Sequence, residues 1–246
     1  MFRPVARRLL GESVFEQLRD RIVGGDVKPG SALPAERTLA TLLKVNRNAV
    51  REGLKRLEQA GLVAIHQGGA TRVLDFKRTA GLEVLSTMLV RSDGTIDTRI
   101  CRGIVEMRTQ LAPTVGSLAA ERAHRANDTR LAAIVARMRK ADGDVAAASR
   151  LALDFWAEVV AATQNIALEL SFNSLDASYG IVIEQLENVM ADEVTAIASY
   201  AALADAIRDR DAKLAASCAK RIVERGHASF MRLLAELDAA QSKGRS

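Results

Sequence analysis

The sequence predicts a mainly α protein with a small N-terminal head and a larger, all-helical body. Three of the four prolines lie before residue 35, and most paired glycines and tight turns fall in the same region. Beyond residue 95, apolar residues recur at helical spacing and strand-like alternation is missing. The formal charge divides in the same way, because residues 1–75 carry the entire excess of +5 and residues 76–246 are balanced. We therefore expect domains at 1–75 and 76–246.

Several functional classes are disfavoured by what the sequence lacks. Its apolar runs are shorter than the roughly 20 residues that cross a bilayer, and residues 1–10 contain no signal-peptide core. The two cysteines, Cys101 and Cys218, form neither a disulfide framework nor a metal-spaced pair. We find no Gly-rich phosphate loop, no Cys/His nucleophile pair and no Gly-x-Ser-x-Gly motif. We expect a cytoplasmic protein that is not an enzyme, needs no cofactor and has no membrane partner.

The head begins with two expected helices. Phe15, Leu18 and Ile22 form the apolar stripe of the first, which should end at Gly24-Gly25. Lys28-Pro29-Gly30 is a turn. Pro34 suits the first position of a second helix, and the buried face of that helix is expected at its leucines, which are Leu39, Leu42 and Leu43.

A third helix and a hairpin should complete the head. Asn46 is a good N-cap for a helix that reaches about Ala60, where Gly61 is placed to end it. Residues 62–65 and 71–73 form two short strands around Gln67-Gly68-Gly69. Three helices followed by a β-hairpin are the order of a winged helix-turn-helix.

The third helix has two chemically different faces. Val50, Leu54 and Leu57 should pack inward, whereas Arg47, Arg51 and Lys55, with Asn48 beside them, line the opposite side. Duplex DNA requires cations for its phosphates, and Arg or Asn side chains to recognise guanine and adenine edges in the major groove. An ordinary solvated amphipathic helix is the alternative, but the hairpin that follows favours DNA binding.

The head resembles the DNA-binding domain of the GntR family of bacterial transcription regulators. The similar runs are 30–40, 45–54 and 57–63, and residues 75–85 resemble the linker and first body helix of the FadR branch of that family. The resemblance implies a winged helix-turn-helix followed by an all-α antiparallel helical bundle that binds an effector.

The resemblance also implies which residues contact double-stranded DNA. Arg37 would do so from the second helix, while His66, Gln67 and Gly68 at the wing tip would reach a minor groove, although His66 could instead cap a strand end. From the third helix the contacts would be Asn46, Arg47, Asn48 and Arg51. Asn46, Asn48, Gln67 and Gly69 depart from the residues of the fatty-acid-responsive members, so the operator sequence is expected to differ.

The body lacks the metal ligands that many members of this branch carry. They hold a divalent metal through one Asp and three His, and the corresponding positions here resemble Ala152, Trp156, Tyr200 and Ile222. Without an imidazole, a metal held in this way is not expected. The apolar replacements suit an acyl chain lined by Trp156, Tyr200 and Ile222, or a tighter core with no ligand.

Two further segments of the body resemble effector-binding parts of this family. Residues 225–229 are similar to a segment that contacts acyl-CoA, which implies roles for Gly226, His227 and Ser229. Helix-on-helix contact would explain Gly226 equally well. Arg108 matches an arginine that is common in these bundles, and either an anionic head group or a structural ion pair would use it.

These features together predict a homodimeric transcription regulator, for example a repressor, that binds a palindromic operator. A small-molecule effector in the bundle would control it. Long-chain acyl-CoA or a fatty acid is the expected effector, and the alternatives are a small organic acid, such as a sugar, hydroxy or keto acid, and a ligand-free DNA binder.

Overall fold

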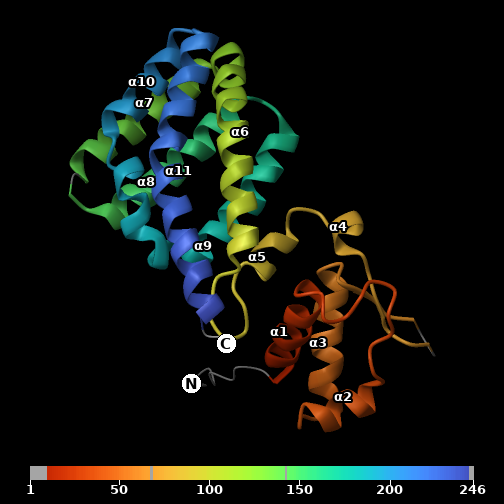
Figure 1. Ribbon diagram of the computed structural model, residues 1–246. Coiled ribbons are helices and arrows are strands. Elements are labelled where there is room, and N and C mark those ends of the chain that lie inside the picture. Colours follow the sequence, from red (N-terminus) through yellow and green to blue (C-terminus); the bar gives the residue numbers. More distant parts are fainter. Residues whose placement is uncertain (1–9, 67–68, 142, 244–246) are drawn as a thin grey trace, which may run out of the picture. The chain divides into compact units, whose positions relative to one another are not determined.

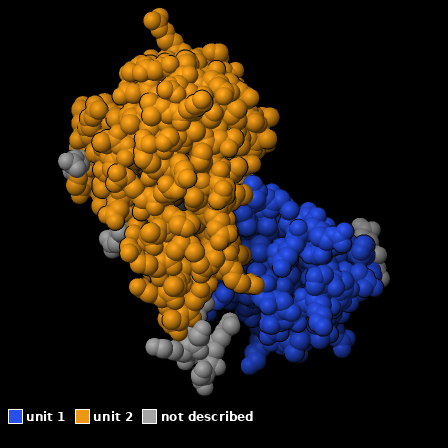
Figure 2. Space-filling view, turned by 45° about the horizontal axis from the view of Figure 1, so that its top comes forward, with its two compact units in different colours: residues 1–97 blue, residues 98–246 orange. Residues whose placement is uncertain are grey.

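The computed structural model describes residues 10–66, 69–141 and 143–243, with the backbone alone over 178–188 and 241–243. Contacts between residues divide the chain into two compact units, 1–97 and 98–246 (Figure 2). Unit 1 is a small helical domain with a two-stranded hairpin, and unit 2 is a helical bundle (Figure 1). The predicted fold class, a winged helix-turn-helix followed by an all-α bundle, is confirmed.

Unit 1 is built on three helices that share one core. They are α1 (Leu10–Val23), α2 (Glu36–Leu42) and α3 (Arg47–Gln59). The predicted stripe of α1, Phe15, Leu18 and Ile22, is buried. Gly53 of α3 permits the close approach of α1, because a Cβ atom there would lie 2.7 Å from Val14 Cγ1.

The second helix differs in detail from the prediction. It begins at Glu36 with Ala35 as its cap, so Pro34 precedes the helix and is not its first residue. Leu39 is buried, but Leu42 is 66% exposed, and its predicted place in the core is wrong. Leu39 and Leu43 are four residues apart and share a face of the helix, whereas Leu42 lies to one side of that face.

The wing consists of β1 (Val63–Ala64) and β2 (Arg72–Val73), which pair in an antiparallel register with Val63 opposite Val73. Gly61 adopts the left-handed φ of 68° that ends α3, as expected of a glycine after a helix. Ala32 forms a further bridge to Arg72, so the segment before α2 lines the hairpin. The Gly30 and Leu33 N–H groups donate to the Val73 and Thr71 carbonyl oxygens at 2.8 Å, so this segment pairs along β2.

Residues 76–97 are grouped with unit 1, although the sequence places the start of the body at residue 76. This segment contains α4 (Phe76–Thr79) and α5 (Val84–Met88). Arg19 of α1 is 6% exposed and donates to the Thr87 carbonyl oxygen at 2.6 Å, and Asp20 accepts from the Ser92 N–H at 2.7 Å. These hydrogen bonds join the segment to α1.

Unit 2 contains the longer helices of the chain. They are α6 (Thr98–Arg122), α7 (Arg125–Lys140), α8 (Val145–Ala162), α9 (Ile166–Val194), α10 (Ile197–Arg208) and α11 (Ala212–Lys243). Helices α6 and α11 lie side by side and antiparallel (Figure 1), since Arg102 near the start of α6 pairs with Asp238 near the end of α11 at 3.1 Å. At the other end, a Cβ atom on Gly116 would lie 2.8 Å from the Ala215 carbonyl oxygen. Glycine therefore permits this close packing.

Aromatic side chains mark the centre of the bundle. Phe155 of α8 and Tyr200 of α10 are both fully buried, and their rings meet edge to face with centroids 5.1 Å apart. Trp156 lies 6.5 Å from the Phe155 ring, again edge to face. Within the described chain, no helix combines the length and the apolar character that a membrane span requires.

Candidate nucleic-acid interface and effector site

Helix α3 is fixed in unit 1 by its buried face and by its cap. Val50, Leu54 and Leu57 are at most 2% exposed, as the periodicity predicts. The Asn46 carboxamide oxygen accepts a hydrogen bond from the Ala49 N–H at 2.9 Å, which satisfies one of the free donors at the helix start. Packing and capping together determine which side of α3 faces the solvent.

The opposite side of α3 presents the basic and amide side chains at the surface. Arg47, Asn48, Arg51 and Lys55 are all exposed, and so is Arg37 of α2. Arg47, Arg51 and Lys55 follow one another at intervals of four residues and form one stripe. A stripe of this kind combines cations for phosphates with forked donors for base edges.

One residue that sequence reasoning missed contacts this stripe. Glu36, in the first turn of α2, accepts a hydrogen bond from Arg51 Nε at 2.7 Å, and both side chains stay partly exposed. The signal in the sequence was weak, because 15 residues separate the two and each belongs to a different helix. The pair restricts the Arg51 side chain within the candidate interface.

The wing contributes one described candidate residue. His66 is exposed, and its carbonyl oxygen accepts from the Gly69 N–H at 3.0 Å. Gln67 and Gly68, the other expected wing contacts, lie outside the described residues. Arg72 of β2 is exposed and donates to the Gly30 carbonyl oxygen at 3.0 Å, so a further cation lies on the hairpin.

In unit 2, the four positions that correspond to the metal ligands of related proteins are all interior. Ala152, Trp156, Tyr200 and Ile222 are between 0 and 8% exposed. Among the described residues, no group of three or more His, Cys, Asp and Glu side chains is placed to bind a metal ion. The residues at these positions are apolar or aromatic and lack the imidazoles and carboxylates that metal binding requires.

Arg108 forms a buried ion pair that the sequence gave as one of its two possible roles. Its guanidinium contacts the Glu193 carboxylate, which is 1% exposed, whereas the Arg108 side chain is 30% exposed. Burial raises the pKa of Glu193 above its ordinary value, and the neighbouring Arg108 opposes this shift. The described contact of Arg108 is therefore with an internal carboxylate.

The same carboxylate explains the glycine in the middle of α11. A Cβ atom on Gly226 would collide with the Glu193 carboxylate. Close approach at Gly226 was expected, and the group that approaches is a side chain of the bundle itself. Arg108, Glu193 and Gly226 thus form one cluster, defined here as the Arg108 cluster, that joins α6, α9 and α11.

Comparison with known proteins decides the family. Residues 10–73 match the model of the bacterial regulatory proteins of the gntR family, and residues 103–225 match that of the FCD domain. The chain is 40% identical over 234 residues to the HTH-type transcriptional regulator Mce2R of Mycobacterium tuberculosis, covering 94% of this chain and 95% of that protein. The chain belongs to the GntR family.

Other relatives agree with this assignment. The fatty acid metabolism regulator protein of Vibrio cholerae is 38% identical over 94 residues, which are 38% of this chain and 33% of that protein. Among solved structures, Lar, which controls the expression of the Listeria monocytogenes agr system, superposes with a TM-score of 0.58 at 15% identity, covering 95% of this chain and 99% of that one. That likeness shows the fold. This GntR regulator is thus a DNA-binding transcription regulator.

Two other candidate effector residues of the regulator take part in local hydrogen bonds. Thr109 Oγ1 lies 2.8 Å from the Val105 carbonyl oxygen and 3.3 Å from His227 Nδ1. The Thr109 hydroxyl thus joins the backbone of α6 to the His227 ring of α11. Ser229 accepts from Arg232 Nη2 at 3.1 Å.

Helix α8 carries two buried polar groups on one face. Ser149 and Trp156 lie seven residues apart with Ala152 between them, a spacing that keeps all three on one side of a helix. In the part of the chain that the structure describes, Ser149 Oγ and Trp156 Nε1 have no hydrogen-bond partner. Sequence reasoning singled out Trp156 but missed Ser149, because a lone serine in a helix carries no signal.

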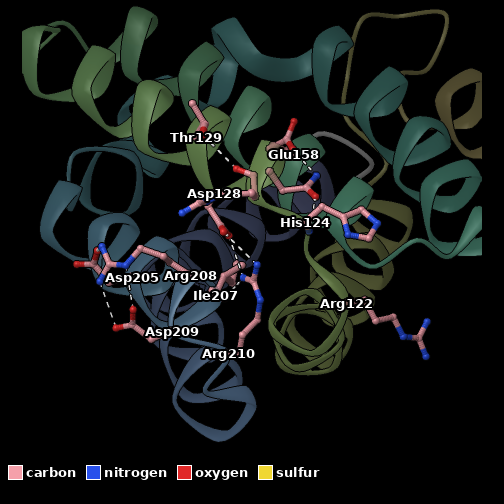
Figure 3. Close-up of polar contacts among 12 residues, drawn as sticks. Arg122, His124, Asp128, Thr129, Glu158, Asp205, Ile207, Arg208, Asp209 and Arg210 are labelled. Carbon is pink, nitrogen blue, oxygen red and sulfur yellow. Dashed lines mark hydrogen bonds and ion pairs between the residues drawn. The ribbon is translucent and has the colours of Figure 1, made fainter.

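A polar network joins α7 to neighbouring parts of the bundle (Figure 3). The Asp128 carboxylate of α7 accepts hydrogen bonds from Nη1 and Nη2 of Arg210, at 2.9 and 3.0 Å. Asn127 donates to Glu158 at 2.7 Å, and Arg130 donates to the other oxygen of the same carboxylate at 2.7 Å. These contacts join α7 to α8 and to the loop after α10, and we assign them a structural role.

Proposed function

We propose that this GntR regulator binds a palindromic operator as a homodimer through α3, and that a small metabolite in unit 2 changes its affinity for that operator. The observation that carries the DNA-reading role is the exposed stripe of Arg47, Asn48 and Arg51 on a helix whose other face is buried. Arginine and asparagine forks of this kind distinguish base pairs in the major groove.

A hydrophobic or partly hydrophobic effector suits the interior of the bundle. Trp156, Tyr200 and Ile222 supply apolar and aromatic surface where related proteins have metal ligands. The Trp156 N–H and the Ser149 hydroxyl would donate to a carbonyl or carboxylate oxygen, since buried polar groups are normally hydrogen-bonded. We propose long-chain acyl-CoA or a fatty acid, with a small organic acid as the second candidate.

The second candidate rests on a different observation. A small carboxylate needs a cation, and Arg108 is the candidate cation that the family resemblance implies. Because Arg108 already contacts Glu193, a small acid would have to displace that carboxylate. The thioester of an acyl-CoA carries no charge at the end of its acyl chain and does not need that cation, which is why we place acyl-CoA first.

Two large apolar side chains support the proposed homodimer. Ile166 and Leu170 of α9 are 68% and 59% exposed and lie one turn apart. A second copy of the chain would cover them, and sedimentation of the wild type and of Leu170→Glu tests this. A dimer that the substitution does not weaken would show that dimerisation uses another surface.

The effector proposal is tested by titration of the regulator with long-chain acyl-CoA, the free fatty acid and a hydroxy acid. Trp156 is the single tryptophan of the chain, so its fluorescence reports binding directly. A mobility shift on DNA selected by the regulator reports the change in operator affinity. We expect acyl-CoA to alter both signals; a response to the hydroxy acid alone would favour the second candidate, and a response to none would favour a ligand-free binder.

A further inference from the structure

Glu36 is an acidic residue in a surface that should meet a polyanion. We propose that it is a positioning residue, which holds Arg51 so that the end of the guanidinium is presented to a base edge. This inference rests on the proposed DNA-reading role of α3. It adds a residue from α2 to the specificity of the interface.

The geometry of the pair leaves the useful edge of Arg51 open. Glu36 Oε2 accepts from Nε, at 2.7 Å, on the side of the guanidinium nearest the chain. Nη1 and Nη2 of Arg51 make no hydrogen bond to the residues that the structure describes. A bidentate contact to the O6 and N7 atoms of guanine uses two such N–H groups of one planar fork.

The exposure of both side chains argues against a role of this ion pair in folding stability. The Arg51 and Glu36 side chains are 62% and 38% exposed, and ion pairs in water contribute little to folding. The pair instead restricts the rotamers of the Arg51 side chain, which is long and would otherwise sample many of them. An arginine that is ordered before binding loses less conformational entropy when it meets a base.

The charge of Glu36 has a second consequence. A carboxylate close to the phosphates of any duplex weakens binding to all sequences alike. At the operator, the contact between the oriented Arg51 and its base offsets this repulsion. Random DNA lacks that contact, so the repulsion is not offset there. Glu36 therefore raises the ratio of specific to non-specific affinity, which is the quantity that matters among competing genomic sites.

The experiment uses the full chain and a randomised double-stranded DNA library. The wild type, Glu36→Gln, Glu36→Ala, Arg51→Ala and the double variant Glu36→Ala/Arg51→Ala each select sequences, and affinities for the wild-type consensus and for random duplex are then measured. Asp26→Asn is the charge-matched control, since Asp26 is an exposed acid of unit 1 with no ion pair among the described residues. Circular dichroism checks that each variant is folded.

We expect Glu36→Gln and Glu36→Ala to lose preference at the same base pair that Arg51→Ala loses, by roughly tenfold for the alanine variant. Affinity for random duplex should rise, because both substitutions remove a negative charge near the phosphates. The double variant should show the same base preference as Arg51→Ala, because Glu36 acts on the base only through Arg51. Its affinity for every sequence should exceed that of Arg51→Ala by the factor that Glu36→Ala gains on random duplex.

Three results would overturn the inference. The first is a change in affinity that is equal for all sequences and leaves base preference intact, as expected of Asp26→Asn. The second is a loss of preference at a base pair that Arg51→Ala leaves intact. The third is that the effects of Glu36→Ala and Arg51→Ala on base preference add. A wild-type chain that selects no sequence at all would instead refute the proposed function. The two failures are therefore distinguishable.

Discussion

Replacing Arg108 with alanine removes the cation from the Arg108 cluster. Glu193 is 1% exposed, so the substitution leaves a carboxylate inside the bundle without its partner. Breaking a buried pair in this way costs about 3–5 kcal/mol. Because the Arg108 side chain is 30% exposed and water already screens part of the pair, we expect the low end, about 3 kcal/mol.

The loss of stability should depend on pH, with a sign fixed by Glu193. Burial raises the pKa of this carboxyl, so the folded protein binds its proton more tightly than the unfolded chain. Its contribution to stability is complete below the unfolded pKa and is lost as pH rises through the folded pKa. Without Arg108 the folded pKa rises further, so the deficit of the variant should be smaller at pH 5 than at pH 8.

Urea unfolding followed by Trp156 fluorescence measures this effect. Trp156 is the single tryptophan and is buried in unit 2, so its signal follows the bundle and not the head. Arg137→Ala is the matched control, because its pair with Asp154 is exposed and should contribute at most about 1 kcal/mol. Glu193→Gln, introduced together with Arg108→Ala, should remove the pH dependence of the stability deficit.

The reasoning fails if Arg108→Ala costs no more than Arg137→Ala. It also fails if the deficit of Arg108→Ala is the same at both pH values. Either result would mean that the Glu193 carboxyl is not held in the interior as an ionised partner of Arg108.

Three other substitutions test the packing of each unit. Asn46→Ala removes the cap of α3 and should destabilise unit 1 by about 1 kcal/mol, seen as faster amide hydrogen exchange in α3. Gly116→Ala places a Cβ atom 2.8 Å from the Ala215 carbonyl oxygen and should cost the bundle about 1–3 kcal/mol in the same fluorescence assay. Arg19→Ala leaves the Thr87 carbonyl oxygen without its donor and should cost about 1–3 kcal/mol, seen as faster exchange in α5.

Each of these expectations has a clear contrary result. Unchanged exchange after the first substitution would mean that α3 does not depend on its cap. A stabilised bundle after the second would mean that the gain in helix propensity outweighs the contact with α11. Unchanged exchange in α5 after the third would mean that residues 76–97 are held to α1 by other contacts.

The features of α3 could be predicted from the sequence because they are local. The alternation of Val50 and Leu54 with Arg47 and Arg51 has the period of a helix, and a capping residue such as Asn46 acts within three residues of its own position. The order of helices and hairpin then determined the fold class. Local periodicity was sufficient for the head and for the helical character of the body.

The partners of the charged residues could not be predicted, because they depend on the tertiary fold. Arg108 and Glu193 are separated by 85 residues, and many acids in the body were equally good candidates by sequence. The meaning of Gly226 follows from the same contact. For Leu42 a local prediction was wrong. Three leucines of the second helix were predicted to be buried, but one side of α2 faces the core and Leu42 lies outside it.

Disulfide cross-linking from Asn48→Cys to duplex DNA tests the central claim most directly. Both native cysteines are buried, so a cysteine at position 48 would be the accessible thiol among the described residues. The partner is a selected duplex with a thiol tethered to a base in the major groove, and Gln17→Cys, on the exposed side of α1, is the control. We expect rapid cross-linking at position 48 and little at position 17; equal rates at both positions, or none at position 48, would contradict the claim that α3 enters the groove.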